Sequence, residues 1–312
     1  FKPEARRDPS PVRNLSVNLG ANGTLVTGVG HSIGISPDGS LLGFILLPDD
    51  DISQDRQLYL RRLHQLTAMP LPGTERTDDF CFSPDSQWIV YTTDDRKGLQ
   101  KISVAGGSPI PLSGAQDIRG LDWSDEEWIV AGSRTSGLMR ISANNGTVES
   151  ITHLTEGEMA HRHPQLLPGG KAVLFNSAGP GGDNIFVQGL PEGRPKLIVQ
   201  GGHGARYLSS GHILYLHEKT VFAIRFNLNS LEVQGQPVPV LNGIFGDPGT
   251  AAHFTLSQGG TMLYVPGELA PPAFQLEWVN REGIREPLPV AADNYQDLEL
   301  SPDGKRLAFS VS

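Results

Sequence analysis

The chain has a single cysteine, no run of 18 apolar residues and no excess of basic residues. One cysteine, Cys81, cannot form a disulfide within the chain and says little about the redox compartment. Without a long apolar run, no part of these 312 residues is expected to span a bilayer as a helix. The net charge of −9 argues against a nucleic acid as the main partner, because binding phosphates requires a basic face.

Helical periodicity and the common catalytic motifs are also lacking. No helical pattern extends beyond about two turns. There is no phosphate-binding Walker loop, no kinase Gly-rich or His-Arg-Asp loop and no His-Glu-x-x-His zinc motif. His161 and His163 lie two apart on one expected strand, but no third metal ligand is assigned to them. The sequence therefore predicts no catalytic residue, no metal and no cofactor, although a carboxylate pair from distant segments would leave no local pattern.

What the chain does contain is a repeat. Seven times an apolar strand pattern runs into a tight turn and continues as a second apolar strand. The turn reads Ser-Pro-Asp-Gly or nearly so at Ser36, Ser83 and Ser301, and weaker copies occur at Ser124, Leu167, Leu208 and Ser257. Successive anchors are 47, 41, 43, 41, 49 and 44 residues apart. A period in the forties with about four short strands per unit is typical of a β-propeller blade.

The predicted fold is therefore an all-β propeller of four-stranded antiparallel blades. Residues 1–11 form a polar linker and residues 12–312 a single propeller domain. After Ser301 the chain supplies only half a repeat, and two strand-like segments, 12–19 and 24–29, precede the first repeat. Pairing these segments with the C-terminal half-blade would close a seven-bladed ring and remove exposed strand edges. A six-bladed ring with a leftover segment is the alternative.

The turn residues have structural roles. Proline sets φ at the second turn position, aspartate bonds back to the backbone, and glycine supplies the left-handed residue that lets the strands resume pairing. Asp38, Asp85 and Asp303 are therefore not catalytic candidates. The Gly-x-Ser-x-Gly match at Gly30–Gly34 is likewise expected to be coincidental, since it leads into a hairpin and not into the helix that a hydrolase nucleophile requires.

The strand before each turn alternates between apolar and polar residues. Counting back from each anchor, positions −1 and −3 are apolar, whereas positions −2 and −4 are small or polar. In a propeller this strand lines the central channel, so the polar positions are expected to face it. The candidate ligand-binding residues at the channel mouth are Asp79, His163, His253 and Asp297 in one ring, and Asp122, Arg206 and Glu299 in another. A merely hydrated polar channel is the alternative.

These repeats resemble the Tol-type translocation propellers, a WD-repeat-like family with the same hairpin. Two stretches, MAHRHPQLLPGGKAVLF (159–175) and FNLNSLEVQGQPVPVLNGI (226–244), resemble the propeller that follows the kinase domain of bacterial transmembrane serine/threonine protein kinases. That resemblance implies a kinase domain and a membrane helix upstream, with this chain as the extracytoplasmic part. Phe1 is not an initiator methionine, so a fragment or a processed product is expected.

The function expected on this basis is a non-catalytic sensor or interaction domain. It would bind a protein, a peptide or a small ligand, and it would be periplasmic or otherwise extracytoplasmic, tethered to the membrane through a preceding segment. A free periplasmic Tol-like interaction propeller is one alternative. A propeller hydrolase or a peptidase-associated domain is another.

Overall fold

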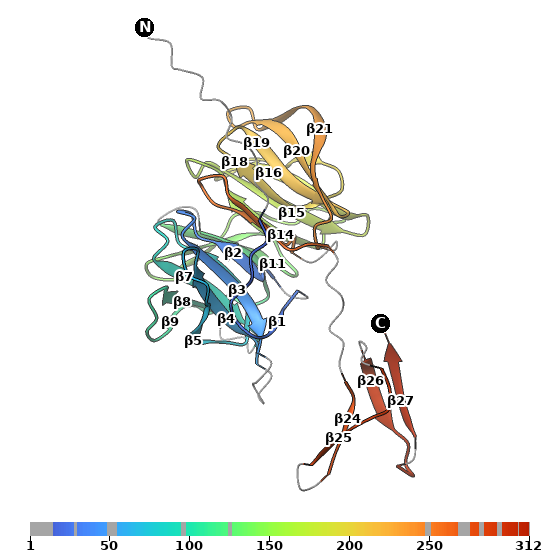
Figure 1. Cartoon of the computed structure of the whole chain (residues 1–312). Helices are drawn as coiled ribbons and strands as arrows, with labels where there is room; N and C mark the ends of the chain where they lie inside the picture. The colour runs from blue at the N-terminus through green and yellow to red at the C-terminus, as the bar shows by residue number, and fades with distance from the viewer. Residues whose placement is uncertain are drawn as a thin grey trace.

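The computed structural model describes residues 15–27, 30–48, 55–94, 98–123, 127–246, 251–267, 275–280, 284–291, 295–304 and 306–311. Within these ranges every regular element is a β-strand, and neighbouring strands pair antiparallel (Figure 1). The prediction of an all-β chain with four-stranded antiparallel sheets is confirmed. No helix long and apolar enough to cross a membrane occurs in the described ranges.

The strands follow one another through successive sheets. The first sheet contains β1 (Thr24–Leu25), β2 (Ile33–Ile35), β3 (Leu41–Leu47), β4 (Gln57–Arg62) and β5 (Met69–Glu75). The second contains β6 (Thr77–Phe82), β7 (Trp88–Thr93), β8 (Leu99–Ser103) and β9 (Ile110–Ser113), and the third β10 (Ile118–Asp122), β11 (Trp128–Ser133), β12 (Met139–Ser142) and β13 (Val148–Ser150). The fourth contains β14 (Ala160–Leu166), β15 (Ala172–Gly179), β16 (Gly182–Gly189) and β17 (Lys196–Val199). The fifth contains β18 (His203–Leu208), β19 (His212–His217), β20 (Thr220–Asn227) and β21 (Glu232–Asn242), and the sixth β22 (Phe254–Leu256) and β23 (Met262–Tyr264).

Apolar side chains hold these six sheets face to face in a closed ring. Six clusters of buried residues each join one sheet to the next, and the last joins the sixth sheet to the first. In this last junction Phe44 and Ile35 of the first sheet pack with Leu263 of β23 and with Val265, which follows it. Burying apolar area is worth about 25 cal/mol per Å², so the sandwiched faces supply most of the driving force for closure. This is the arrangement of a β-propeller, with β2, β6, β10, β14, β18 and β22 innermost.

The turn chemistry predicted from Ser-Pro-Asp-Gly is confirmed. In the first copy the Ser36 hydroxyl donates to Asp38 Oδ1 at 2.6 Å, and the same carboxylate oxygen accepts the Ser40 N–H at 2.9 Å. Gly39 adopts φ +75°, the left-handed conformation that the turn requires. These bonds lower the pKa of Asp38, because the Ser36 hydroxyl and the Ser40 N–H stabilise the ionised form.

The second and seventh copies repeat this geometry. Ser83 donates to Asp85 at 2.5 Å, and Ser301 donates to Asp303 at 2.6 Å. Ser86 takes the place of glycine and still adopts φ +61°. The weaker copy at Ser124 lies outside the described residues.

The predicted role of the N-terminal segments in closing the last blade is wrong. Thr24 and Leu25 form β1, which pairs with Leu47 and Leu46 of β3 in the first sheet. The reason is the shortness of β2, which covers only Leu42–Phe44 of β3 and leaves the remaining edge open to β1. Residues 15–19 form no strand, and residues 12–14 lie outside the described ranges.

The C-terminal strands form two separate hairpins. β24 (Glu277–Val279) pairs with β25 (Arg285–Pro287), and β26 (Tyr295–Leu300) pairs with β27 (Leu307–Val311). Both hairpins lie apart from the six sheets in Figure 1. The seven-blade count is therefore not confirmed, and the single domain over residues 12–312 stays a prediction.

Candidate functional site

The strongest candidate site is a cavity of about 670 Å³ at the centre of the ring. Residues of all six innermost strands line it, and it adjoins the turns that follow those strands. The −2 positions of all six repeats in the ring take part, namely Gly34, Cys81, Asp122, Gln165, Arg206 and Thr255. The expectation that the −2 layer faces the channel therefore agrees with the geometry. A cavity of this size lies within the range of about 300–1,000 Å³ that small-ligand sites occupy.

The floor of the cavity is a chain of polar contacts through His31. An Arg206 Nη2–H group lies 2.9 Å from His31 Nε2, and a guanidinium has only donors, so Nε2 accepts. The proton of His31 is then on Nδ1, which lies 3.2 Å from Asp79 Oδ1. The His31 backbone N–H donates to the same oxygen at 3.1 Å, and the Gly120 N–H donates to Asp79 Oδ2 at 2.9 Å. Both carboxylate oxygens of Asp79 thus accept hydrogen bonds beneath the cavity.

The −4 layer does not line the cavity, contrary to expectation. Ser32, Asp79, His163 and His253 are each no more than 1% exposed. In four strands the cause is a β-bulge, because the register of β6, β10, β14 and β18 shifts at or next to the −4 residue. The registers of β2 and β22 show no such shift, and Ser32 and His253 are buried by their contact with each other. A bulge inserts one residue and re-aims its side chain, so positions −2 and −4 no longer share a face. The left-handed −4 residues in the third, fourth and fifth sheets are Gly120, His163 and Gly204.

The −2 side chains also fasten neighbouring sheets together. Asp122 Oδ2 accepts the Leu166 N–H of the next innermost strand at 3.0 Å. Gln165 Oε1 accepts the Tyr207 N–H of the strand after that at 2.6 Å. In each case a −2 side chain binds the −1 backbone of the following repeat. A structural role therefore accounts for these two polar residues before any ligand is considered.

Replacing Gln165 with leucine is expected to lower the free energy of unfolding by about 1 kcal/mol, because the Tyr207 N–H loses its acceptor. Urea denaturation followed by fluorescence measures this. Gln258 lies exposed on the rim of the same cavity, and Gln258→Leu is the matched control, with a change below about 0.5 kcal/mol. Equal changes in the free energy of unfolding for the two substitutions would show that the bond from Gln165 to the next sheet does not stabilise the ring.

The Gly-x-Ser-x-Gly serine is a structural residue. The Ser32 hydroxyl lies 2.9 Å from His253 Nδ1, and His253 Nε2 lies 3.1 Å from the carbonyl oxygen of Thr27. The second nitrogen of this histidine thus bonds to a backbone carbonyl, and Ser32 is fully buried. The pair joins the first and sixth sheets where the ring closes, and β2 leads into a hairpin as the sequence predicted.

The structure separates the seven predicted site residues into three groups. Asp122 and Arg206 line the cavity, whereas Asp79, His163 and His253 lie buried beneath it. Glu299 is exposed on β26, away from the ring, and Asp297 belongs to the same strand, with a side chain outside the described part. Whether any of them binds a ligand stays a prediction.

Sequence reasoning missed His31, which touches both Arg206 and Asp79. It occupies position −5, one residue before the layer that alternation assigned to the channel. His31 lies just before β2, whose pairing with β3 shows no register shift, and its contacts with Asp79 and Arg206 hold it at the floor of the cavity. The glycines at −4 in the third and fifth repeats are the sequence features that point to the bulges in β10 and β18.

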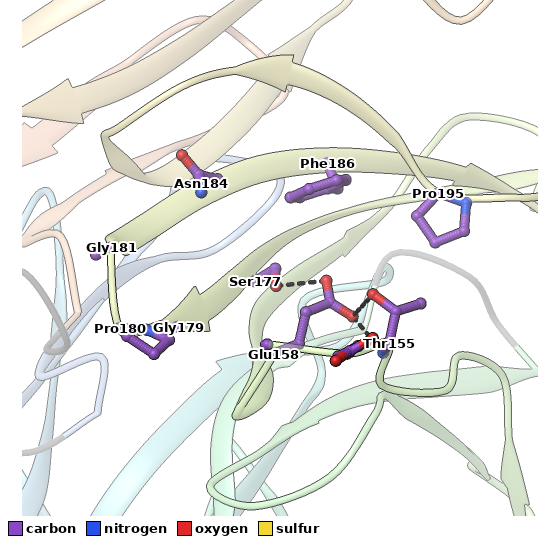
Figure 2. A pocket seen from close by; sticks show the side chains of 12 residues that line it. Thr155, Glu158, Ser177, Gly179, Pro180, Gly181, Asn184, Phe186 and Pro195 are labelled. Atoms are coloured by element: carbon purple, nitrogen blue, oxygen red, sulfur yellow. Dashed lines mark hydrogen bonds between the residues drawn. The ribbon is translucent and has the colours of Figure 1, made fainter.

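A second, smaller cavity of about 370 Å³ lies at the opposite end of the fourth sheet, between the segment before β14 and the β15–β16 turn. Figure 2 shows Glu158 there between Thr155 and Ser177. Its carboxylate accepts the Ser177 hydroxyl at 2.6 Å, the Thr155 N–H at 2.6 Å and the Thr155 hydroxyl at 2.8 Å. Burial opposes ionisation of Glu158, but these bonds outweigh it and lower its pKa. Glu158 is therefore ionised at neutral pH, and its hydrogen bonds stabilise this loop.

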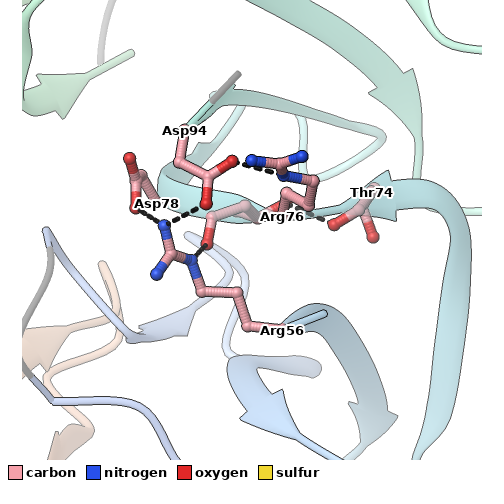
Figure 3. Close-up of polar contacts among 6 residues, drawn as sticks. Arg56, Thr74, Arg76, Asp78 and Asp94 are labelled. Carbon is pink, nitrogen blue, oxygen red and sulfur yellow. Dashed lines mark hydrogen bonds and ion pairs between the residues drawn. The ribbon is translucent and has the colours of Figure 1, made fainter. Parts of the chain in front are cut away.

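A network of ion pairs lies between the first two sheets, at the end where β6 begins. Arg56 binds Asp78 and lies 3.1 Å from Asp94, which also pairs with Arg76 at 2.5 Å (Figure 3). Arg56 Nε–H donates to the Thr77 carbonyl at 2.9 Å. Burial nevertheless raises the pKa of Asp78, with Asp94 adding to the effect of burial. These partly exposed pairs join the segment before β4 to the β5–β6 corner.

Comparisons with known proteins agree with the propeller and give no family. No family model matches the chain, and no curated protein matches it. Among solved structures, a TolB-type protein from Agrobacterium tumefaciens aligns at TM-score 0.57 and 17% identity, over 76% of this chain and 90% of that one. An oligogalacturonate lyase from Vibrio parahaemolyticus aligns at TM-score 0.53 and 14% identity, over 93% and 86%. Another oligogalacturonate lyase, in complex with manganese, aligns at TM-score 0.54 and 16% identity, over 93% and 94%. These similarities support the Tol-type propeller fold predicted from the repeat.

Proposed function

We propose that this chain is a non-catalytic β-propeller module that binds a protein, a peptide or a small ligand through its central cavity. The observation that carries the proposal is an open cavity of about 670 Å³ reached by every innermost strand of the ring. Its walls are largely apolar, with a small number of polar groups at the floor, which is the usual composition of a ligand site. Beneath it, Asp79, Ser32 and His253 are engaged in bonds between sheets.

The biological setting of this module is a further part of the proposal. The two longer segments that resemble kinase-associated propellers support an extracytoplasmic sensor domain of a bacterial serine/threonine protein kinase, tethered to the membrane by a preceding segment. The structural similarity to a TolB-type protein supports instead a free periplasmic interaction propeller. Reading the coding sequence upstream of Phe1 separates the two: a kinase domain with one hydrophobic span, or a cleavable signal peptide.

The similarity to two oligogalacturonate lyases motivates a second candidate, a lyase of the same kind. The residues do not fit the manganese that one of these proteins binds. Among the described residues, no three His, Cys, Asp or Glu side chains come together in a way that could hold a metal ion. His253 already uses both ring nitrogens, on Ser32 and on Thr27. Formation of unsaturated product from oligogalacturonate would nevertheless reverse the choice between the two candidates.

Filling the cavity is expected to weaken ligand binding. Thr255 is half-buried in the cavity wall, and Thr255→Trp places a large ring in the space that a ligand would take. Peptides selected from a displayed library on the natural protein are expected to bind this variant at least about tenfold more weakly, a loss of about 1.4 kcal/mol. Thr147→Trp, at an exposed position outside the cavity, is the matched control. Selected peptides that bind all three proteins equally would place the interaction elsewhere on the ring.

A further inference from the structure

We propose that the central cavity selects a carboxylate on an apolar body, with the carboxylate bound by Arg206 at the cavity floor. This inference rests on the proposed binding function and names the chemistry of the ligand. Two sources carry such a group, the C-terminus of a peptide and a free organic acid. Both present the same planar oxyanion, which matches the fork of a guanidinium.

Arg206 is held in place by partners that do not neutralise it. Its Nη1–H donates to the carbonyl oxygen of Ala205 at 2.9 Å, and its Nη2–H donates to His31 Nε2 at 2.9 Å. Both acceptors are uncharged, the imidazole because its proton is on Nδ1 and shared with Asp79. The guanidinium is thereby oriented at low entropic cost, while its charge still lacks a directly bonded anion among the described residues.

The basic character of this floor extends below Arg206. The ring of His163 lies edge-on to His31 at 5.3 Å, and neither of its nitrogens has a hydrogen-bond partner among the described residues. Burial lowers the pKa of His163 far below its usual value, and His31, Arg206, His203 and Arg162 add to this effect. His163 is therefore neutral at pH 7, and the positive charges in this part of the floor are those of Arg206 and Arg162.

The acidic groups near Arg206 are already engaged by the protein. Asp79 lies under the floor and accepts three N–H groups. Asp122 faces the cavity, and its Oδ2 accepts the Leu166 N–H at 3.0 Å. Burial raises the pKa of the Cys81 thiol far above its usual value, so this third neighbour is uncharged. Burial likewise lowers the pKa of Arg206, and Asp122 and Asp79 counteract that effect.

The walls above the floor define the rest of the ligand. The −1 side chains of the six repeats all line the cavity, namely Ile35, Phe82, Trp123, Leu166, Tyr207 and Leu256. Three of these are aromatic and three aliphatic, so the space between the floor and the mouth favours an apolar body. The ligand is therefore expected to enter with its carboxylate first and its apolar part against these rings.

The test uses two pairs of probes, measured by isothermal titration calorimetry on the whole chain. N-acetyl-leucyl-phenylalanine and its C-terminal amide represent a peptide end, and 4-phenylbutyrate and its methyl ester represent an organic acid. We expect at least one acid to bind about tenfold more tightly than its uncharged counterpart. Whichever acid binds identifies the source. Equal binding of acids and uncharged counterparts, or no binding of either acid at millimolar concentration, overturns the inference.

Two variants with opposite expected signs sharpen the test. Arg206→Gln should weaken the acid about tenfold and leave the uncharged probe unchanged. Asp122→Asn should tighten the acid about threefold, because it removes a like charge but keeps an oxygen for the Leu166 N–H. If Arg206→Gln unfolds at a lower temperature than the natural chain, Arg206→Lys, which keeps the charge, is used in its place. A third outcome separates the two proposals. If Thr255→Trp weakens peptide binding but Arg206→Gln and Asp122→Asn do not change it, the proposed binding function stands and carboxylate recognition by Arg206 is refuted.

Discussion

Replacing Asp79 with alanine is expected to lower the free energy of unfolding by about 4 kcal/mol, because a buried charge-assisted network loses the carboxylate that accepts its N–H groups. Asp79 is 1% exposed and belongs to the second sheet. It accepts the backbone N–H and the Nδ1–H of His31, between β1 and β2 of the first sheet, at 3.1 and 3.2 Å, and the Gly120 N–H of the third sheet, at 2.9 Å. A single side chain thus ties three sheets, and its removal leaves buried donors without acceptors.

Denaturant titration of the natural chain and of Asp79→Ala measures this loss. Asp79→Asn should give an intermediate value, since one oxygen remains while the amide group faces other donors. The matched control is Asp85→Ala in the same sheet, an exposed turn residue bonded within its own turn, for which about 1 kcal/mol is expected. A loss of less than 1 kcal/mol for Asp79→Ala would mean that apolar packing alone holds the sheets together here.

The ring could be predicted from sequence because its determinants are local and repeated. Each hairpin turn is specified by a few adjacent residues, as Ser36, Asp38 and Gly39 show, and the apolar −1 and −3 residues specify which face is buried. The −2 residues could be assigned to the channel for the same reason. Errors arose where a property depends on residues distant in sequence.

Closure of the ring and the floor of the cavity are two such properties. Pairing of β1 with β3 depends on β2 being only three residues long, which no local pattern reveals. The bulge at position −4 of β6 moves Asp79 beneath the floor. His31, from the segment before β2, reaches the floor through its contacts with Asp79 and Arg206, which are distant in sequence. The bonds from Asp122 and Gln165 to the next repeat join residues about one repeat apart, and only the three-dimensional ring brings them together.

Stability should also fall steeply below pH 6.5, because two buried imidazoles resist protonation in the folded chain. Burial lowers the pKa of His161, with Glu158 opposing this, and lowers that of His163 far more, with His31 and Arg206 adding to the effect. Above pH 6.5 both histidines are neutral whether the chain is folded or not. Below it the unfolded chain takes up protons that the folded chain refuses, so the free energy of unfolding falls by up to about 2.7 kcal/mol per pH unit until the folded-state pKa values are reached.

Denaturant titrations at pH 7, 6 and 5 measure this slope, in a window above the range in which Glu158 titrates. His163→Asn removes one of the two imidazoles and tolerates the left-handed backbone at φ +48°, so it should roughly halve the slope. His153→Gln, at an exposed histidine, should leave the slope unchanged and serves as the control. A natural chain equally stable at pH 7 and pH 5 would mean that the buried rings take up protons without cost. The charge of the protonated imidazoles would then have to be balanced by an anion or solvated by water beneath the floor. Such a partner would change the charge that a ligand carboxylate meets at the floor of the cavity.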